Sequence, residues 1–393
     1  MPRLLFVCNT AAILVRFRMP LLKAAAAEGY EVTCVCGEGM DAESYVAKLI
    51  SAGFGVHRLP GLEQGGLSPR QLKREADTIG AVVDDLRPAI LHSFTHRANV
   101  AAFLALRNRP GVRFIPNVTG AGRLFDEKSS LRKQLARMAL LQLYRQMGRR
   151  CECIFFQNND DVAEIGGFMR LPSARLLLTG GSGLDPEEIG VEPSDNTAEL
   201  RRQFKLNYDI APEKRIFLFP ARGLKAKGVQ EFYEAAGYYL DLFDDAVFVH
   251  AGEPGDDDPQ GVGHEELVDM QRPGLHFIGF QPDIYSLINA SAVVVLPSFY
   301  REGIPRSLIE ALYFGKLVLT TDEPGCRETV IDGWNGRVVQ ARSAQSLLAA
   351  MVATQAMNPS EVARNSRRLF DAKFRVDRVT AVYLEQYARP VEQ

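Results

Sequence analysis

The sequence lacks the features that mark several common classes of protein. It has 46 Lys and Arg residues against 48 Asp and Glu residues, so the basic excess of a nucleic-acid binder is missing. The six cysteines form no Cys-x-x-Cys pair of the kind that holds zinc, and we expect buried thiols in a reducing cytoplasm. No run of about 18 uncharged apolar residues occurs, which argues against a transmembrane helix. Arg16 and Arg18 interrupt the apolar N-terminus, which therefore fits a first strand and loop better than a signal peptide.

The chain instead alternates short apolar runs with segments of helical periodicity. This alternation is typical of parallel sheets wrapped by helices. We therefore predict an α/β protein with two Rossmann-like domains and a cleft between them, over residues 1–190 and 200–374, and a C-terminal helix over 375–393. The polar segment 185–199 is the predicted linker. The expected strands are Leu4–Cys8, Val32–Cys36, Val56–Leu59, Ile90–His92, Arg113–Pro116, Cys153–Phe156, Leu176–Thr179, Arg215–Phe219, Ala246–Ala251, His276–Ile278, Val293–Leu296 and Leu317–Thr321.

One strand–helix–strand unit in the second domain has an unusual loop. The apolar run Val293–Leu296 predicts a strand buried on both faces, and the polar loop after it leads to Pro305 at the start of a helix. The first amides of such a helix, on Arg306, Ser307 and Leu308, are expected to be unpaired and to point out of the carboxyl edge of the sheet. Together with the helix dipole they favour an anionic ligand.

Two carboxylates accompany this helix start. Glu302 lies in the loop, and Glu310 lies in the helix on the face that it shares with Ser307 and Phe314. A carboxylate on a partly apolar face is costly to bury without partners, and sugar or ribose hydroxyls are suitable partners. The alternative is a surface helix with two solvated glutamates.

The loop after the first strand of the second domain carries two cations. Arg222 and Lys227 lie five residues apart between Phe219 and Gly228, and the glycines of this loop let a ligand approach the backbone. Arg as a fork and Lys as a point charge can hold one diphosphate. The alternative is a pair of solvated residues in a surface loop, but the anion site on another strand of the same sheet favours the diphosphate.

Motifs run through both domains in a fixed order. In the second domain they are Arg222, Lys227-Gly228, Gly279-Phe280, Leu296-Pro297-Ser298, Glu302, Glu310, Pro324-Gly325-Cys326-Arg327-Glu328 and Asn335-Gly336. In the first domain they are Asn117-Val118-Thr119-Gly120-Ala121-Gly122 with Phe125, then Phe156-Gln157-Asn158-Asn159-Asp160-Asp161, and Gly180-Gly181-Ser182-Gly183-Leu184-Asp185. The second-domain set resembles the family 4 retaining nucleotide-sugar glycosyltransferases, which have the two-domain GT-B fold. The first-domain set resembles their bacterial branch that builds polyprenyl-diphosphate-linked oligosaccharides for O-antigen, capsule or protein glycosylation.

The resemblance implies roles on the donor side. Arg222 and Lys227 would hold the donor diphosphate and stabilise charge on the departing nucleotide, which is often the largest catalytic contribution. Glu310 resembles the glutamate that binds the ribose hydroxyls. Glu302 resembles the one beside the donor sugar and joins the two cations as a candidate catalytic residue. The other implied donor contacts are Gly303, Ile304, Leu308 and Phe280. Transfer on one face and double displacement through a carboxylate both remain open.

The acceptor side departs from the family pattern. Many members have a His near the position of Thr119, and the first loop, from Asn9, lacks the paired glycines that often face the donor phosphates. A His often precedes the residue that matches Arg18, where this chain has Phe17. A lone His more often has a structural role. The candidate acceptor residues are Asn9, Arg18, His92, His96, Thr119, Gly120 and Arg123.

Two stretches bear on cofactors and partners. Asp256-Asp257-Asp258 lies in a loop rich in turn formers and is expected to be solvated, and the resemblance implies no metal and no other cofactor. Residues 129–150 form a predicted helix with a strongly basic remainder, and its apolar face consists of Leu131, Leu135, Met138, Leu141 and Tyr144. That composition is typical of a helix attracted to anionic lipid headgroups, and the alternative is an amphipathic helix that packs on the sheet.

The combined prediction is a cytoplasmic retaining glycosyltransferase, with contact to the inner membrane face through 129–150 left open. We expect it to move a sugar from a nucleotide sugar, preferably a UDP-sugar, to a polyprenyl-diphosphate-linked saccharide. The alternatives are a nucleotide-sugar epimerase of the same fold and a non-catalytic scaffold that binds nucleotide sugar. The joint presence of Arg222, Lys227, Glu302 and Glu310 favours the enzyme over the scaffold.

Overall fold

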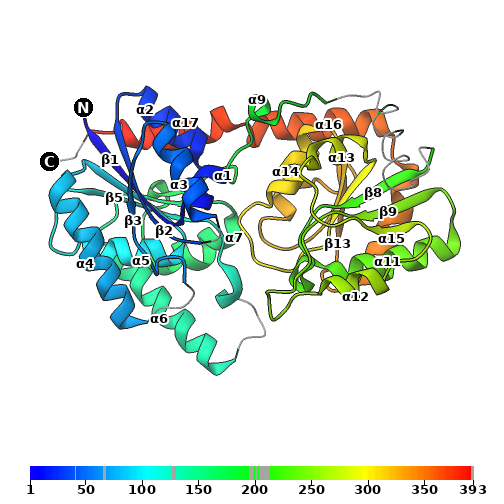
Figure 1. Cartoon of the computed structure of the whole chain (residues 1–393), viewed down its shortest axis with the longest axis horizontal. Coiled ribbons are helices and arrows are strands. Elements are labelled where there is room, and N and C mark those ends of the chain that lie inside the picture. Colours follow the sequence, from blue (N-terminus) through cyan, green and yellow to red (C-terminus); the bar gives the residue numbers. More distant parts are fainter. Residues whose placement is uncertain are drawn as a thin grey trace. The chain divides into compact units, whose positions relative to one another are not determined.

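The computed structural model describes residues 1–39, 41–64, 68–125, 130–193, 199, 202 and 213–390, except for the side chain of Arg123. The chain divides into unit 1, comprising Met1–Gly183 and Val376–Gln393, and unit 2, comprising Leu184–Arg375. Each unit contains a parallel sheet with helices on both faces, as Figure 1 shows. The predicted α/β fold with two Rossmann-like domains is thus confirmed.

Unit 1 is organised around a seven-stranded parallel sheet, counted over the described residues, with the strand order β3-β2-β1-β4-β5-β6-β7. Side chains alternate between two core layers because successive residues of a strand point to opposite faces. Leu5 and Val7 of β1 pack with α4, α5 and α6, whereas Phe6 and Cys8 pack with α2 and α17. The strands are β1 (Arg3–Thr10), β2 (Glu31–Gly37), β3 (Gly55–Arg58), β4 (Ile90–Phe94), β5 (Arg113–Val118), β6 (Ile154–Phe156) and β7 (Leu176–Leu178). The helices are α1 (Ala11–Phe17), α2 (Met19–Ala27), α3 (Ala42–Ser51), α4 (Pro69–Leu86), α5 (His96–Ala105), α6 (Leu131–Met147), α7 (Asn159–Asp161), α8 (Gly167–Met169) and α17 (Val376–Tyr387), with short turns η1 (Gly122–Phe125), η2 (Val162–Gly166) and η3 (Ser173–Arg175).

Unit 2 has a six-stranded parallel sheet in its described part, with the order β10-β9-β8-β11-β12-β13. The central strands β8 and β11 are buried throughout their apolar runs, as expected for parallel strands covered on both faces. The strands are β8 (Arg215–Phe219), β9 (Ala246–His250), β10 (Leu275–Phe277), β11 (Val293–Leu296), β12 (Leu317–Thr321) and β13 (Gly336–Val339). The helices are α9 (Pro186–Ile189), α11 (Val229–Leu242), α12 (His264–Asp269), α13 (Ile284–Ala290), α14 (Arg306–Tyr313), α15 (Ala344–Ala353) and α16 (Pro359–Lys373), with short turns η4 (Lys225–Lys227), η5 (Arg327–Thr329) and η6 (Thr354–Ala356).

The last helix, α17, is part of unit 1. Its Tyr383 and Tyr387 lie in the same core layer as Phe6. The amide of Asn117 donates to the Tyr383 hydroxyl at 2.7 Å, and Arg113 donates to the backbone carbonyl of Tyr387 at 2.9 Å. These polar contacts fix α17 to strand β5 from its last two turns.

The structure corrects three local expectations. The residues after Asn9 were expected to form a loop, but Thr10 caps α1 by accepting a hydrogen bond from the Ile13 amide at 3.3 Å. Strand β13 was not predicted, because its sequence, Gly-Arg-Val-Val, is not a continuous apolar run. The predicted linker 185–199 begins with α9, which Asp185 caps through a bond from the Glu187 amide. Its residues 194–198 lie outside the described part of the chain.

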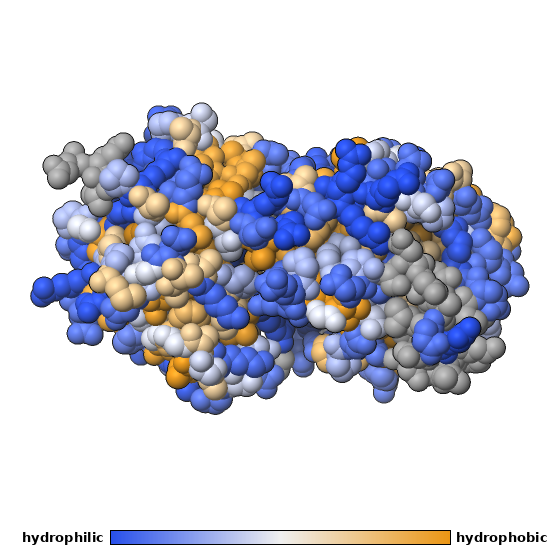
Figure 2. Space-filling view, turned by 90° about the horizontal axis from the view of Figure 1, so that it is seen from above, coloured by the Kyte–Doolittle hydropathy of each residue, from blue (hydrophilic) through white to orange (hydrophobic). Residues whose placement is uncertain are grey.

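The two units differ in their surfaces. Figure 2 shows apolar side chains gathered over unit 1 on the face in view, whereas unit 2 presents mostly hydrophilic groups there. Leu131, Leu135 and Met138 of α6 add to the exposed apolar surface of unit 1.

Candidate functional site

The carboxyl edge of the sheet in unit 2 is formed by loops that glycines allow to touch. A Cβ atom on Gly228 would lie 2.3 Å from the carbonyl oxygen of Pro297, so only glycine lets the loop after β8 pass the loop after β11. Gly325, in the loop after β12, would bring a Cβ atom within 1.4 Å of the Gly303 carbonyl oxygen. The amide of Phe299 also donates to the Ala226 carbonyl at 2.9 Å. These contacts explain why the motif has glycine at positions 228 and 325, and they hold three loops together.

The stacked loops bring two predicted site residues into contact. Lys227, at the end of η4, donates to the carboxylate of Glu302 at 2.6 Å. The Ser298 hydroxyl donates to the same carboxylate oxygen at 3.2 Å. Both side chains of the ion pair are about four-fifths buried, which makes the pair stronger than a surface ion pair. The pair is therefore a rigid feature of the edge, available to share its charges with a ligand.

Arg222 and Phe280, two other predicted donor residues, follow strands β8 and β10 at the carboxyl edge of the same sheet. Arg222 is half exposed, and its nearest carboxylate, that of Glu253, lies 3.9 Å away, so it is held loosely. Phe280 follows β10 and is 63% exposed, which is unusual for a large aromatic side chain. A diphosphate could contact Arg222 without breaking a strong contact, and Phe280 offers an apolar surface to a ligand.

The helix start at α14 differs in detail from the prediction. Pro305 is the N-cap residue and not the first helical residue, and no side chain caps the helix. The Leu308 amide, expected to be unpaired, donates to the Pro305 carbonyl at 3.1 Å because the first turn is tightened. Any anion at this helix start is therefore held by the amides that precede Leu308. The backbone of Gly303 and Ile304 leads into this turn, with the Gly303 carbonyl against Gly325.

Glu310 is buried in α14 and has a partner that the sequence analysis missed. Arg306 lies one turn earlier and its Nε donates to the Glu310 carboxylate at 3.1 Å. The spacing of four residues was a visible signal for this pair. Burial raises the pKa of Glu310 to about 7, and the charge of Arg306 opposes part of that rise. The carboxylate is thus poised between its two protonation states near neutral pH.

In unit 1, the two predicted histidines have structural partners. His96, at the start of α5, contacts the Tyr144 hydroxyl at 2.8 Å and the Ala121 carbonyl at 3.1 Å, so both ring nitrogens are occupied. Burial lowers its pKa to about 4, and it is neutral at pH 7. His92 is fully buried in β4 and contacts the Tyr387 hydroxyl, and burial lowers its pKa well below the usual value.

The remaining acceptor-side candidates lie at or near the carboxyl edge of the unit 1 sheet. The Thr95 hydroxyl donates to the side chain of Asn9, which links the loops after β4 and β1. Thr95 has a φ of 79°, a rare and strained value for a β-branched residue. Thr119 and Gly120 follow β5 and are partly exposed. The Arg123 side chain lies outside the described residues, and Arg18 is buried between α1 and α2.

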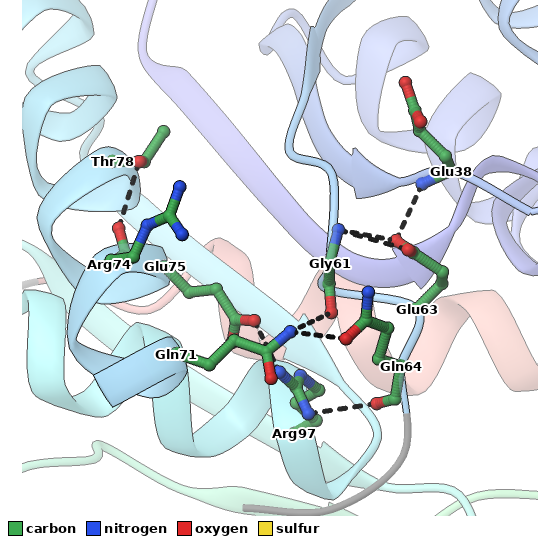
Figure 3. A network of polar contacts seen from close by, with 9 residues as sticks. All are labelled: Glu38, Gly61, Glu63, Gln64, Gln71, Arg74, Glu75, Thr78 and Arg97. Atoms are coloured by element: carbon green, nitrogen blue, oxygen red, sulfur yellow. Dashed lines mark hydrogen bonds and ion pairs between the residues drawn. The ribbon is translucent and has the colours of Figure 1, made fainter. Parts of the chain in front are cut away.

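The loop after β3 also reaches this edge, and sequence reasoning missed its anchor. Figure 3 shows Arg97 of α5 between Glu75 of α4 and the backbone of Gln64. Arg97 donates to the Glu75 carboxylate at 2.6 Å and to the Gln64 carbonyl at 3.0 Å, and the ion pair is almost fully buried. Glu63 accepts from the amides of Glu38 and Gly61, which closes the loop on itself. Because the pair lies 22 residues apart, no local pattern revealed it.

No group of acidic, cysteine or histidine residues suited to a metal ion occurs among the described residues. Asp256, in the acidic triplet, accepts from the amide of His264 at 3.1 Å and so serves its own loop. No helix in the described part of the chain is long and apolar enough to cross a membrane.

The protein has two Rossmann-like units, and stacked loops at the carboxyl edge of the second sheet carry cations and glutamates. This combination is that of a GT-B glycosyltransferase. Comparison with known proteins supplies the family. Residues 15–180 match the glycosyl transferase 4-like domain, and residues 201–364 match the glycosyl transferases group 1 domain. The chain therefore belongs to this family of glycosyltransferases.

Curated relatives span most of the chain. One relative is the N,N'-diacetylbacillosaminyl-diphospho-undecaprenol alpha-1,3-N-acetylgalactosaminyltransferase of Campylobacter jejuni. The two sequences are 27% identical over 345 residues, and this alignment covers 88% of this chain and 87% of the relative. This chain is also 24% identical over 211 residues to the UDP-Gal:alpha-D-GlcNAc-diphosphoundecaprenol alpha-1,3-galactosyltransferase of Escherichia coli, over 52% of this chain and 53% of that one.

Solved structures agree on the fold. A glycosyltransferase from Rickettsia africae matches with a TM-score of 0.75 and 17% identity, over 98% of this chain and 97% of that chain. HepE from Anabaena, solved with UDP-glucose, matches with a TM-score of 0.74 and 16% identity, over 99% of this chain and 100% of that chain. The GT-B architecture predicted from the sequence is confirmed.

Proposed function

We propose that this glycosyltransferase moves a sugar from a UDP-sugar to a polyprenyl-diphosphate-linked saccharide and retains the anomeric configuration. The observation that carries this proposal is the edge of unit 2, where Lys227 lies 2.6 Å from Glu302 and Arg222 is loosely held nearby. Two cations suit a diphosphate, and a carboxylate beside them suits sugar hydroxyls. The names of the Campylobacter and Escherichia relatives, which both specify diphospho-undecaprenol acceptors, support the acceptor class.

The chemistry of the transfer follows from this edge. As the bond between the anomeric carbon and the phosphate oxygen breaks, negative charge grows on the leaving UDP. Arg222 and Lys227 stabilise that charge, and Glu310 accepts hydrogen bonds from the ribose. Glu302 already accepts hydrogen bonds from Lys227 and Ser298, so its carboxylate is engaged within the protein and is poorly placed to act as a nucleophile. We therefore favour transfer on one face, in which the donor phosphate takes the proton of the acceptor hydroxyl.

A panel assay tests this function. Purified protein is incubated with UDP- and GDP-sugars, with and without polyprenyl-diphosphate saccharides, and the products are separated by mass and linkage. We expect an elongated lipid-linked product with an α-linkage from an α-linked UDP-sugar. Conversion of the donor without an acceptor would instead identify an epimerase. Binding of UDP without any turnover would identify a scaffold.

A lipid-linked acceptor requires the enzyme to work at a membrane surface, and α6 supplies a candidate contact on the inner face. Leu131, Leu135 and Met138 are 71%, 63% and 48% exposed, whereas Leu141 and Tyr144, predicted on the same face, are buried in the core of unit 1. The exposed first half of α6 supports a membrane contact, whereas the apolar side chains of its second half pack in the core as the alternative predicted.

Residues 131–150 contain six basic residues and no acidic residue. Arg137 pairs with Glu164, and Arg150 donates to the Val112 carbonyl. Arg132, Lys133 and Arg149 are exposed, and these three suit an anionic bilayer.

Flotation with liposomes tests the membrane contact. We expect wild-type protein to float with vesicles that contain anionic lipid, and the double variant Leu131→Glu, Leu135→Glu to remain in the bottom fraction. Leu242→Glu is the matched control, because Leu242 of α11 is 64% exposed. Equal flotation of all three proteins would contradict the assignment of α6.

A further inference from the structure

Arg18 is an arginine in an unusual place. It ends α1 and precedes α2, and only 3% of it is exposed. Its guanidinium group lies over the ring of Phe94, with 4.6 Å between the guanidinium carbon and the ring centroid. By contrast, Arg16 on the preceding turn is exposed and bonds the Tyr45 hydroxyl at 2.9 Å. The two arginines share a helix, so burial is what distinguishes Arg18.

No carboxylate pairs with the buried guanidinium among the residues that the structure describes. Within the described residues it makes no hydrogen bond and no ion pair, and its Nε atom is fully buried without a partner. The titratable groups that it influences are Cys8, His92 and Tyr387. Burial raises the pKa of Cys8 to about 12, raises that of Tyr387 and lowers that of His92, so all three are neutral at pH 7. An isolated buried cation is costly, and the cost is recovered when an anion binds.

Arg18 lies at an edge of the unit 1 sheet where a ligand anion would bind. Phe94 is the last residue of β4, and Cys8 lies near the end of β1. Arg18 therefore lies at the carboxyl edge of the sheet in unit 1, which is where open α/β sheets bind ligands. The link between Thr95 and Asn9 fixes the two loops beside it, and Thr95 is strained to do so. The local structure thus holds an unpaired cation at a ligand-binding edge.

We propose that Arg18 binds the diphosphate group of the acceptor. This inference rests on the proposed function, because that function supplies a second diphosphate besides that of the donor. The donor diphosphate has its own cations, Arg222 and Lys227, in unit 2. Arg forms paired hydrogen bonds with two oxygens of a phosphate group. Because so little of this guanidinium group is exposed, it is suited to phosphate oxygens and not to a bulky group. Arg18 is then the residue that distinguishes a lipid diphosphate acceptor from a free saccharide.

Kinetics with two matched acceptors test the proposal. One acceptor is a short polyprenyl-diphosphate saccharide, and the other is the same saccharide on an alkyl chain without phosphate. For Arg18→Met we expect KM for the diphosphate acceptor to rise at least about tenfold, with little change for the alkyl glycoside. Arg18→Lys should recover part of the loss, because it keeps the charge but not the fork. Arg16→Met is the control and should behave as wild type.

Three outcomes would overturn the inference. Equal losses with both acceptors would assign Arg18 a packing role, a raised KM for the UDP-sugar would place it on the donor, and unchanged kinetics would leave it without a ligand role. The wild-type reaction with the diphosphate acceptor tests the proposed function by itself. Binding of inorganic diphosphate in the presence of saturating UDP gives a readout that does not need turnover. We expect calorimetry to detect it with wild type and Arg16→Met, and to show it weakened at least about tenfold with Arg18→Met.

Discussion

The cations at the carboxyl edges of the two sheets differ in whether a carboxylate pairs with them. In unit 2, Lys227 pairs with Glu302, Arg306 with Glu310 and, more loosely, Arg222 with Glu253. In unit 1, Arg97 likewise pairs with Glu75, but Arg18 is buried with no carboxylate partner in the described part of the chain. The carboxylate partners stabilise the cations of unit 2 and Arg97 before any ligand arrives, whereas Arg18 has only the ring of Phe94. This difference is the basis on which we propose a ligand role for Arg18.

The largest effect is expected when the two buried arginines of unit 1 are replaced one at a time and the stabilities of the variants are compared. Arg97→Met leaves the carboxylate of Glu75 buried and alone, so we expect a loss of about 3–5 kcal/mol in the free energy of unfolding. Arg18→Met removes an unpaired charge and should leave that free energy unchanged or higher. Urea unfolding followed by circular dichroism measures both. A large loss for Arg18→Met would mean that its charge has a partner in the fold.

The next largest effect is expected at the paired cation of unit 2. Lys227→Ala should lower kcat by about 100- to 1,000-fold, because a group that stabilises charge in the transition state is lost. Lys225→Ala is the matched control, since Lys225 is exposed in the same short helical turn and has no assigned role. Steady-state kinetics with a saturating UDP-sugar gives the comparison. A kcat within a few-fold of wild type for Lys227→Ala would refute its role at the diphosphate.

A third test uses the pH dependence of UDP binding. Glu310 faces Arg306 on its own helix and Tyr285 of α13, and its pKa of about 7 lies above the usual value. The carboxylate is therefore ionised above pH 7 and protonated below it, and only the ionised form accepts two ribose hydroxyls. UDP affinity should fall by up to about tenfold per pH unit below 7, because one proton opposes binding. Calorimetry at several pH values should show a flatter profile for Glu310→Gln, and identical profiles would count against the ribose contact.

The smallest effect is expected at Glu253. Its pair with Arg222 is long and exposed, so Glu253→Gln should change the free energy of unfolding by less than about 0.5 kcal/mol. The same change frees Arg222 for the ligand, and UDP affinity should stay equal or rise slightly. A marked loss of UDP affinity would show that Glu253 positions Arg222.

Much of the fold was predictable because parallel strands buried on both faces leave continuous apolar runs. The strand expected at Val293–Leu296 matches β11 residue for residue, and the edge strand β13 was missed because Gly-Arg-Val-Val is not a continuous apolar run. The donor motifs were visible since their glycines and charges are close in sequence. Contacts between distant segments left no local signal.

The acceptor edge was the least predictable part of the molecule. Arg16 and Arg18 look alike in the sequence, and only the packing of α1 and α2 shows that one is exposed and the other buried. His92 was a candidate because it could replace the His that the family often has near Thr119, yet Tyr387, which contacts it, lies 295 residues away. Burial depends on tertiary packing, so charge alone could not separate a site residue from a surface residue there.

The location of α17 has a consequence for recombining enzymes of this kind. Unit 2 is an insertion in unit 1, since the chain leaves unit 1 after Gly183 and returns at Val376. A chimera made with one crossover near position 183 would join the body of unit 1 to a foreign final helix, whose residues would have to match Asn117 and Arg113. Exchange of unit 2 between relatives therefore calls for two crossovers, at 183/184 and 375/376, so that Tyr383 and Tyr387 stay with the strand β5 that they contact.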